Sequence, residues 1–244
     1  MSSRVLKLGG SVITEKDSPE TVDDDRLERV VEALRGTENL VLVHGGGSFG
    51  HHHALTHGVS QSEGSHDSAG VLAIHRAMKR LNDRVLDRLH AHGVPALPVH
   101  PLSAGYRDRE GTLFHPISQV ATMVDEGFVP VLHGDVIVQA EAGATVLSGD
   151  DLVVALADGL DADRVGLCST VPGVLDGDGA VIDRIDRIES VVDVLGGSDS
   201  TDVTGGMAAK VEKLLATDAP AWIFGPDDVE AFLTGESPGT LIDG

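Results

Sequence analysis

Four glycines and a histidine follow the apolar run Leu40–Val43 of this 244-residue chain: Gly45, Gly46, Gly47, Gly50 and His51. Backbone N–H groups that carry no side chains can close around an anion, and a following helix adds the positive end of its dipole. We therefore predict a phosphate-binding loop at residues 45–50, with His51 where the loop ends. The spacing Gly45-x-Gly47-x-x-Gly50 also matches the dinucleotide fingerprint, so an NAD(P)-dependent oxidoreductase is an alternative.

Three of the five lysines lie beside glycine-rich or turn sequence: Lys7, Lys16 and Lys210. Lys7 ends a predicted strand just before Gly9-Gly10, and Lys210 lies one turn into a helix that follows Gly205-Gly206. A cation at the carboxyl end of a strand or at the start of a helix can reach phosphate oxygens. The alternative is that each of these lysines is simply exposed to solvent. Two facing glycine loops with lysines beside them would hold two phosphate-bearing ligands for in-line phosphoryl transfer.

An acidic pair opens a predicted helix in the sequence Ser148-Gly149-Asp150-Asp151. Ser148 and Asp150 are both residue types that cap helix N-termini. Asp150 is therefore either a cap, or an acid that holds lysines in place or helps to hold a metal.

His52, His53 and His57 follow the glycine run. Consecutive residues on one element point in different directions, so no common face collects these imidazoles, and we expect no metal site. The polar, glycine-bearing residues 58–70 predict a loop or hairpin near the site.

Strands and helices alternate along the chain, which is typical of a parallel α/β sheet in one compact body. Apolar runs predict strands at residues 4–8, 40–43, 96–99, 129–132, 136–139, 145–147, 164–168 and 221–224. Helical spacing predicts helices at residues 21–34, 71–92, 117–126, 152–160, 188–195 and 227–233, and one that begins after Gly205-Gly206. Residues 103–117 favour an excursion or a hairpin, and residues 136–139 and 145–147 favour a hairpin through Gly143.

The composition excludes several classes of protein. The formal net charge is −21, which repels nucleic acid and anionic membranes and suits a halophilic protein, with an ordinary acidic protein as the alternative. No apolar run approaches the ~20 residues of a membrane helix, and the N-terminus lacks the apolar stretch of a signal peptide, so we expect a cytoplasmic protein. The single cysteine, Cys168, excludes an internal disulfide.

Four motifs resemble, in order, those of the amino acid kinase superfamily: Lys7-Leu-Gly-Gly-Ser11, His44-Gly-Gly-Gly47, Ser148-Gly-Asp-Asp151, and Thr204-Gly-Gly-Met207 with Lys210. Within it, Gly47-Ser-Phe-Gly-His51 and residues 75–82 resemble the isopentenyl phosphate kinases. The resemblance implies an α/β fold, a three-layer αβα sandwich with a mainly parallel central sheet, in a homodimer. It also implies one amino acid kinase-like domain over residues 1–244, with an acceptor lobe (1–160) and a nucleotide lobe (161–244).

The resemblance further implies that MgATP donates its γ-phosphoryl group to isopentenyl phosphate. Lys7 and Lys210 would contact ATP phosphates, Lys16 would stabilise the transferring group, and Asp150 would orient the lysines. The acceptor phosphate would meet Gly46, Gly149 and His51, and an imidazole near neutrality suits a dianion. The remaining ATP contacts would come from Leu8, Gly9, Gly10, Ser11, Gly47, Thr170 and Gly206.

Thr170-Val-Pro-Gly173 departs from the Asp-Val-Asp-Gly common in the family's nucleotide loop, so we expect relaxed base preference. The magnesium ligands stay open, with ATP oxygens and water as the expected holders. A kinase of a phosphonate or small carboxylate is the nearest alternative function. A ligand sensor without turnover is another, although Lys7, Lys16, Asp150 and Lys210 argue against it.

Overall fold

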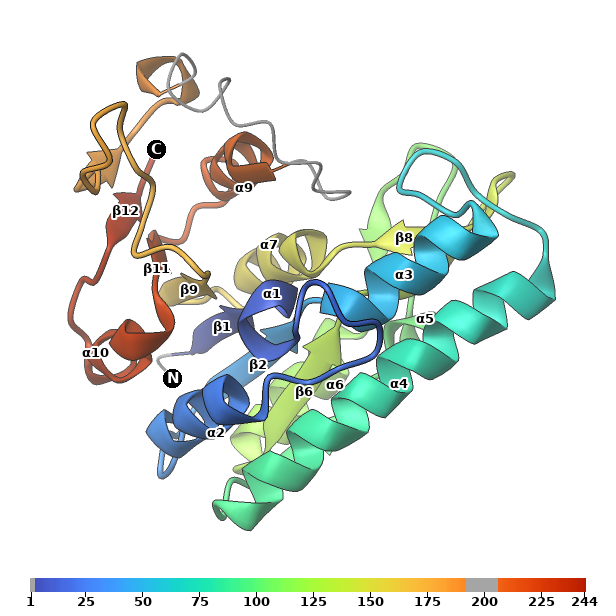
Figure 1. The fold of residues 1–244 in the computed structure, drawn as a ribbon, viewed down its shortest axis with the longest axis horizontal. Coiled ribbons are helices and arrows are strands. Elements are labelled where there is room, and N and C mark those ends of the chain that lie inside the picture. The colour runs from blue at the N-terminus through green and yellow to red at the C-terminus, as the bar shows by residue number, and fades with distance from the viewer. Residues whose placement is uncertain (1–2, 192–205) are drawn as a thin grey trace.

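A computed structural model describes residues 3–191 and 206–244 (Figure 1). In these residues the main sheet has eight strands. Their order is β10 (Arg184–Ile185), β12 (Thr240–Ile242), β11 (Ala221–Phe224), β9 (Arg164–Cys168), β1 (Arg4–Leu8), β2 (Leu40–His44), β6 (Val129–His133) and β3 (Ala96–Pro98). Only the β11–β12 pair is antiparallel among them. The predicted α/β fold with a mainly parallel sheet is confirmed.

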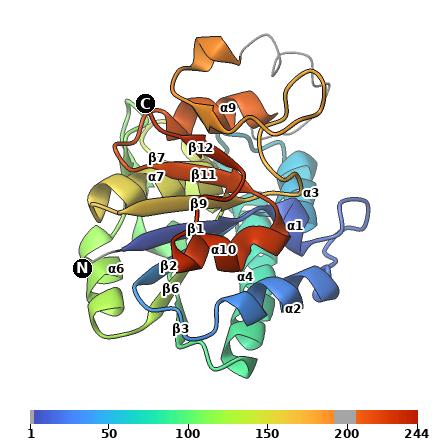
Figure 2. The same cartoon turned by 90° about the vertical axis from the view of Figure 1, so that its left-hand side faces the viewer.

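Helices cover both faces of this sheet, as Figure 2 shows with α6 (Ile117–Asp125) on the left and α2 (Asp24–Ala33) and α4 (Ser68–Ala91) on the right. Alternate residues of β1 explain the two layers: Leu6 and Leu8 belong to one buried cluster, and Val5 to another. The first cluster includes α2, α4 and α10 (Val229–Thr234), whereas the second includes α6, α7 (Gly149–Gly159) and α9 (Gly206–Leu214). The chain is therefore a three-layer αβα sandwich.

A smaller sheet, in the order β5 (Leu113–Phe114), β4 (Tyr106–Arg107), β7 (Asp135–Gln139) and β8 (Gly143–Leu147), flanks the main one. It contains both predicted hairpins, β4–β5 and β7–β8. Ser65 joins it through an isolated bridge to Ala144, which ties the polar segment before α4 to this sheet.

Several short elements complete the fold: α1 (Gly10–Ile13), α3 (Gly47–His57), α5 (Pro101–Ala104), and the 3₁₀ turns Ile188–Ser190 and Pro226–Asp228. The sequence patterns missed β12, because three residues carry too little periodicity to identify a strand. Of the predicted helix 188–195, the structure shows a 3₁₀ turn, and residues 192–195 lie outside the described residues. Within the described ranges, no helix combines the length and the apolar character needed to cross a bilayer.

Strand β1 lies between β2 and β9, so successive crossovers leave it in opposite directions. In open α/β sheets, ligands bind outside the carboxyl ends of strands at such a reversal. The predicted glycine turns after β1 and β2 both lie at this edge.

Candidate active site

The loops after β1 and β2 pack backbone against backbone. Gly45 N donates a 2.9 Å hydrogen bond to Leu8 O. A Cβ atom on Gly45 would lie 2.6 Å from Gly10 N, and one on Gly47 would lie 2.7 Å from Gly10 O. Gly47 also has a φ of +46°, which favours glycine. The absence of side chains therefore brings the two predicted glycine loops together.

The second glycine loop is shorter than predicted, because α3 begins at Gly47. Gly46 has nearly helical dihedral angles (φ −77°, ψ −28°), and its carbonyl accepts from Phe49 N at 3.1 Å and Gly50 N at 2.9 Å. His51 consequently lies within α3 and is half-buried, and it does not mark the end of a loop. Glycine lowers helix propensity, but packing and first-turn hydrogen bonds override that preference here.

Thr14, which ends α1, connects the two loops. Its Oγ1 donates to Gly10 O at 2.8 Å and accepts from Ser48 N in the first turn of α3 at 3.0 Å. The side chain is almost completely buried. One hydroxyl thus satisfies a carbonyl of the first loop and a helix-start amide of the second.

Three glycines from different elements converge beside this pair of loops. A Cβ atom on Gly134 would lie 3.5 Å from Gly149 N and 3.8 Å from Gly46 N. The space beside Gly134 is thus bordered by these two backbone nitrogens, the first of which belongs to the first turn of α7, and by Leu147 O at 3.4 Å. Converging N–H groups at a helix start suit an anion. We call Gly46, Gly134 and Gly149 the glycine cradle.

Lys7 borders this cradle and is held by Asp150. Its Nζ donates to Asp150 Oδ1 at 2.7 Å, and both side chains are buried. A Cβ atom on Gly149 would lie 3.0 Å from Lys7 Cε, so this glycine leaves space for the lysine. Ser148, not Asp150, is the N-cap of α7, since its Oγ accepts from Asp151 N at 3.1 Å. Asp150 therefore has no capping role, and its carboxylate pairs with Lys7.

Lys16 lies exposed on the turn after α1. Glu20, at the other end of this turn, accepts from His53 Nε2 of α3 at 2.6 Å and from Arg80 Nη2 of α4 at 2.7 Å. Arg80 and, less strongly, His53 lower the pKa of the Glu20 carboxyl. The turn that carries Lys16 is thereby fastened to two helices, and His53 is an ion-pair partner.

The predicted nucleotide residues lie after β9 and on α9. Thr170 is exposed in the loop that follows β9. Gly206, with a φ of +68°, begins α9, and Lys210 Nζ lies 3.4 Å from Gly206 O. Thr204 and Gly205, which open the same motif, fall outside the described residues.

Asp151 joins three elements around the start of α7. Its carboxylate accepts from Lys213 Nζ of α9 at 2.6 Å and from Arg107 Nη2 of β4 at 2.8 Å. Burial disfavours the charged carboxylate, but Lys213, followed by Arg107, outweighs burial and lowers the pKa of Asp151. Lys213 lies one turn beyond Lys210, so this ion pair holds the helix that carries a predicted ATP contact.

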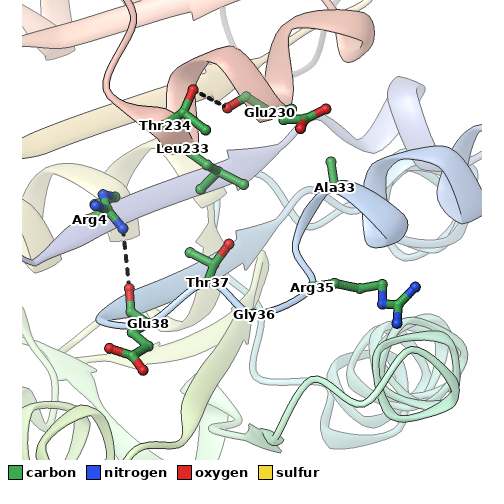
Figure 3. A pocket seen from close by; sticks show the side chains of 9 residues that line it. All are labelled: Arg4, Ala33, Arg35, Gly36, Thr37, Glu38, Glu230, Leu233 and Thr234. Atoms are coloured by element: carbon green, nitrogen blue, oxygen red, sulfur yellow. Dashed lines mark hydrogen bonds between the residues drawn. The ribbon is translucent and has the colours of Figure 1, made fainter.

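A cavity of about 390 Å³ lies at the opposite, amino-terminal end of β1 and β2 (Figure 3). Arg4 Nη1 donates there to Glu38 O at 3.3 Å, and Glu230 contributes a second acid to the lining. Neither glycine loop borders this cavity. Arg4 and Arg35 also line it, so its charges are balanced, and its place at the amino ends of the strands is what argues against a phosphate site.

Comparison with known proteins identifies the family. The amino acid kinase family model matches residues 3–217. An isopentenyl phosphate kinase from Haloferax volcanii is 66% identical, and the alignment covers 100% of both chains. The chain belongs to the amino acid kinase family and, within it, to the isopentenyl phosphate kinases.

A second isopentenyl phosphate kinase, from Methanocaldococcus jannaschii, is 34% identical over 98% of both chains. Solved isopentenyl phosphate kinase structures agree: one X-ray structure has a TM-score of 0.83 at 30% identity, covering 98% of both chains. A substrate complex of an isopentenyl phosphate kinase has a TM-score of 0.79 at 26% identity, covering 99% of both. The fold and the kinase family predicted from the motifs are therefore confirmed.

For an isopentenyl phosphate kinase, the motifs alone left three site features unpredicted: Thr14, Gly134 and the Asp151–Lys213 pair. In the sequence, Thr14 looks like an ordinary threonine before a turn, and Gly134 like a simple turn glycine. Lys213 offered one signal, since lysine is scarce in the chain and Lys213 lies three residues after Lys210. Their contacts join residues that are far apart in sequence, which local patterns do not encode.

Proposed function

We propose that this chain transfers the γ-phosphoryl group of ATP to isopentenyl phosphate and forms isopentenyl diphosphate. An oxygen of the acceptor phosphate attacks the γ-phosphorus, the bond to the β–γ bridging oxygen breaks, and ADP leaves with the electron pair. The glycine cradle carries the proposal, because two amides converge there beside a buried lysine. Such preorganised donors stabilise charge without reorganising during the reaction.

In this proposal Gly46, Gly149 and His51 hold the acceptor phosphate. Lys16 stabilises the transferring group, and its fastened turn supports that placement. Asp150 keeps Lys7 beside the cradle, where its charge serves an ATP phosphate.

ATP binding is proposed to involve Lys7, Lys210 and residues at four places: the end of β1, the start of α3, the loop after β9 and the start of α9. The residues concerned are Leu8, Gly9, Gly10, Ser11, Gly47, Thr170 and Gly206. The proposed acceptor lobe (1–160) and nucleotide lobe (161–244) would then meet at the β1–β9 pair, and the ATP phosphates would contact residues of both lobes. Homodimer formation stays a prediction from the family resemblance. Relaxed preference for the nucleotide base stays a prediction from Thr170-Val-Pro-Gly173.

Magnesium is proposed to enter with ATP as the MgATP substrate. In the described part of the chain, no group of three or more acids, histidines or cysteines has a metal-binding arrangement. The site acids Asp150 and Asp151 are each committed to cations. ATP oxygens and water therefore supply the donors that Mg²⁺ prefers, and the protein supplies lysines around the phosphates.

The test is ADP release in molar KCl with MgATP and a panel of acceptors: isopentenyl phosphate, dimethylallyl phosphate, fosfomycin, glutamate, aspartate and UMP. A strong preference for isopentenyl phosphate supports the proposal. Turnover only with fosfomycin or a carboxylate would show that the chain is a kinase of another acceptor. If the chain bound ATP but turned over none of these acceptors, the alternative of a ligand sensor would be favoured.

His51→Ala is expected to lower kcat/KM for isopentenyl phosphate by roughly two orders of magnitude, because a charge-assisted donor to the acceptor phosphate is lost. The Kd for ATP, measured by calorimetry, should stay within about twofold. His52→Ala, on the next and exposed residue of α3, is the matched control. An unchanged kcat/KM in His51→Ala would remove this residue from the acceptor site.

A further inference from the structure

Two parallel strands end in the same dipeptide at the glycine cradle: β2 in His44-Gly45 and β6 in His133-Gly134. We propose that His44 and His133 are positioning residues: His44 aims the Gly46 amide of the cradle at the acceptor phosphate by holding Gly45 O, and His133 holds Gly134 O and so keeps Gly134 in place beside that amide. This inference rests on the proposed acceptor site.

Both imidazoles make the same short contact with the chain. His44 Nδ1 lies 3.0 Å from Gly45 O, and His133 Nδ1 lies 2.9 Å from Gly134 O. The two histidines are register partners in the sheet, and their rings stack with centroids 5.5 Å apart. Both side chains are fully buried. A carbonyl oxygen only accepts hydrogen bonds, so Nδ1 is the protonated nitrogen in each ring.

Burial keeps both imidazoles neutral, lowering the pKa of His133 to about 3 and that of His44 in the same direction. In a neutral ring with a proton on Nδ1, Nε2 is an acceptor. His133 Nε2 lies 2.9 Å from His100 Nδ1, which donates to it.

His44 Nε2 lies 3.1 Å from the Asn82 amide oxygen, while Asn82 Nδ2 is buried without a hydrogen-bond partner. Rotating that amide by half a turn lets Nδ2 donate to His44 and satisfies both groups. In each ring, Nε2 therefore accepts a hydrogen bond from a neighbouring side chain, and Nδ1 donates one to the carbonyl of the following glycine.

Fixing a carbonyl also fixes the next amide, because C=O and N–H point in opposite directions across a trans peptide. His44 holds Gly45 O, so the Gly46 N–H points away from that imidazole. Gly134 lies on the cradle side, where its Cβ position is 3.8 Å from Gly46 N and 3.5 Å from Gly149 N. Gly134 N in turn donates to His44 O at 2.9 Å, which locks the two dipeptides together.

The chemistry of amide side chains provides a matched pair of variants. The Asn amide nitrogen is two bonds from Cβ, as His Nδ1 is, whereas the Gln amide reaches the position of Nε2. His44→Asn therefore keeps a donor for Gly45 O, and His44→Gln keeps the contact with Asn82 and loses that donor. The same comparison applies to His133.

We expect His44→Gln to raise KM for isopentenyl phosphate roughly tenfold, the equivalent of one hydrogen bond, with KM for ATP within about twofold. His44→Asn should recover most of the wild-type value. His90 is the control, because its Nε2 binds Ala96 O at 2.8 Å, also an imidazole on a carbonyl but at the amino end of β3. His90→Asn, which loses this donor, should leave both KM values unchanged.

A binding readout separates positioning from folding. With glycine labelled by ¹³C at the carbonyl and ¹⁵N at the amide, only the five Gly–Gly peptides of the chain give a correlated signal. Isopentenyl phosphate should shift the Gly45–Gly46 signal in the wild type and in His44→Asn, and much less in His44→Gln.

Equal effects of Asn and Gln at both positions, or KM changes for ATP alone, would overturn the inference. If His44→Gln fails to fold, the His133→Gln and His133→Asn pair gives the same comparison. A wild type that does not use isopentenyl phosphate would instead refute the proposed function.

Discussion

At the residue scale, a single hydroxyl holds the two glycine loops in contact. Thr14→Val removes the donor to Gly10 O and the acceptor of Ser48 N without changing the side chain's shape. We expect the free energy of unfolding to fall by about 1–3 kcal/mol, because two polar groups lose their partner. Urea unfolding at constant KCl measures the change. Thr14→Ser keeps the hydroxyl and should stay close to wild type, and a Thr14→Val variant as stable as the wild type would contradict this role of the hydroxyl.

At the element scale, Asp151 joins α9, α7 and the small sheet. Asp151→Asn removes the charge that faces Lys213 and Arg107, leaving two cations near each other. We expect kcat to fall roughly tenfold, since small displacements of a phosphate-binding helix are costly, and stability to fall by about 1–3 kcal/mol. Steady-state kinetics and urea unfolding measure both. Glu141→Gln, which breaks the exposed Arg109–Glu141 pair, is the control. Loss of stability with an unchanged kcat would make the ion pair purely structural.

Whole-molecule stability is expected to depend on the buried histidines. Burial lowers the pKa of His44, His100 and His133, the last to about 3. Below pH 6.5 the unfolded chain therefore binds protons that the folded chain does not, and stability falls as pH decreases. For His133 the slope averages about 1.2 kcal/mol per pH unit between pH 5 and 6. Unfolding at several pH values measures it. His133→Asn should reduce the number of protons that the chain takes up on unfolding by about one. If stability depended on pH as steeply in this variant as in the wild type, His133 would not be the source of the effect.

The charge of the whole molecule predicts dependence on salt. The chain has 39 acidic residues against 18 lysines and arginines, so the folded state repels itself in dilute buffer. At about 1 M salt the screening length falls to ~3 Å, which removes most of this repulsion. We expect the midpoint of thermal unfolding to rise between 0.1 and 2 M KCl. Full stability and activity in dilute buffer would identify an ordinary acidic protein instead.

The sequence by itself determined the order of the main elements and the family. Long apolar runs and helical periodicity are local properties, so β1, β2, β6, β9 and β11 were predicted close to their observed bounds. The glycine motifs also mark where two loops of the chain come into contact, because only glycine leaves room there for a second stretch of backbone. Asp150 pairs with Lys7 at 2.7 Å, and its role in orienting lysines for ATP stays a prediction.

Only the tertiary structure decided how distant groups combine. Ser148 caps α7 and leaves Asp150 for Lys7, although the sequence allowed either residue as the cap. Helix α3 begins inside the glycine run because Thr14, from another element, satisfies its first turn. The His44–His133 stack and the convergence on Gly134 likewise depend on β2 and β6 being neighbours. Local patterns record which groups a chain carries, but hydrogen bonds and charges between distant residues exist only after the sheet order brings those residues together.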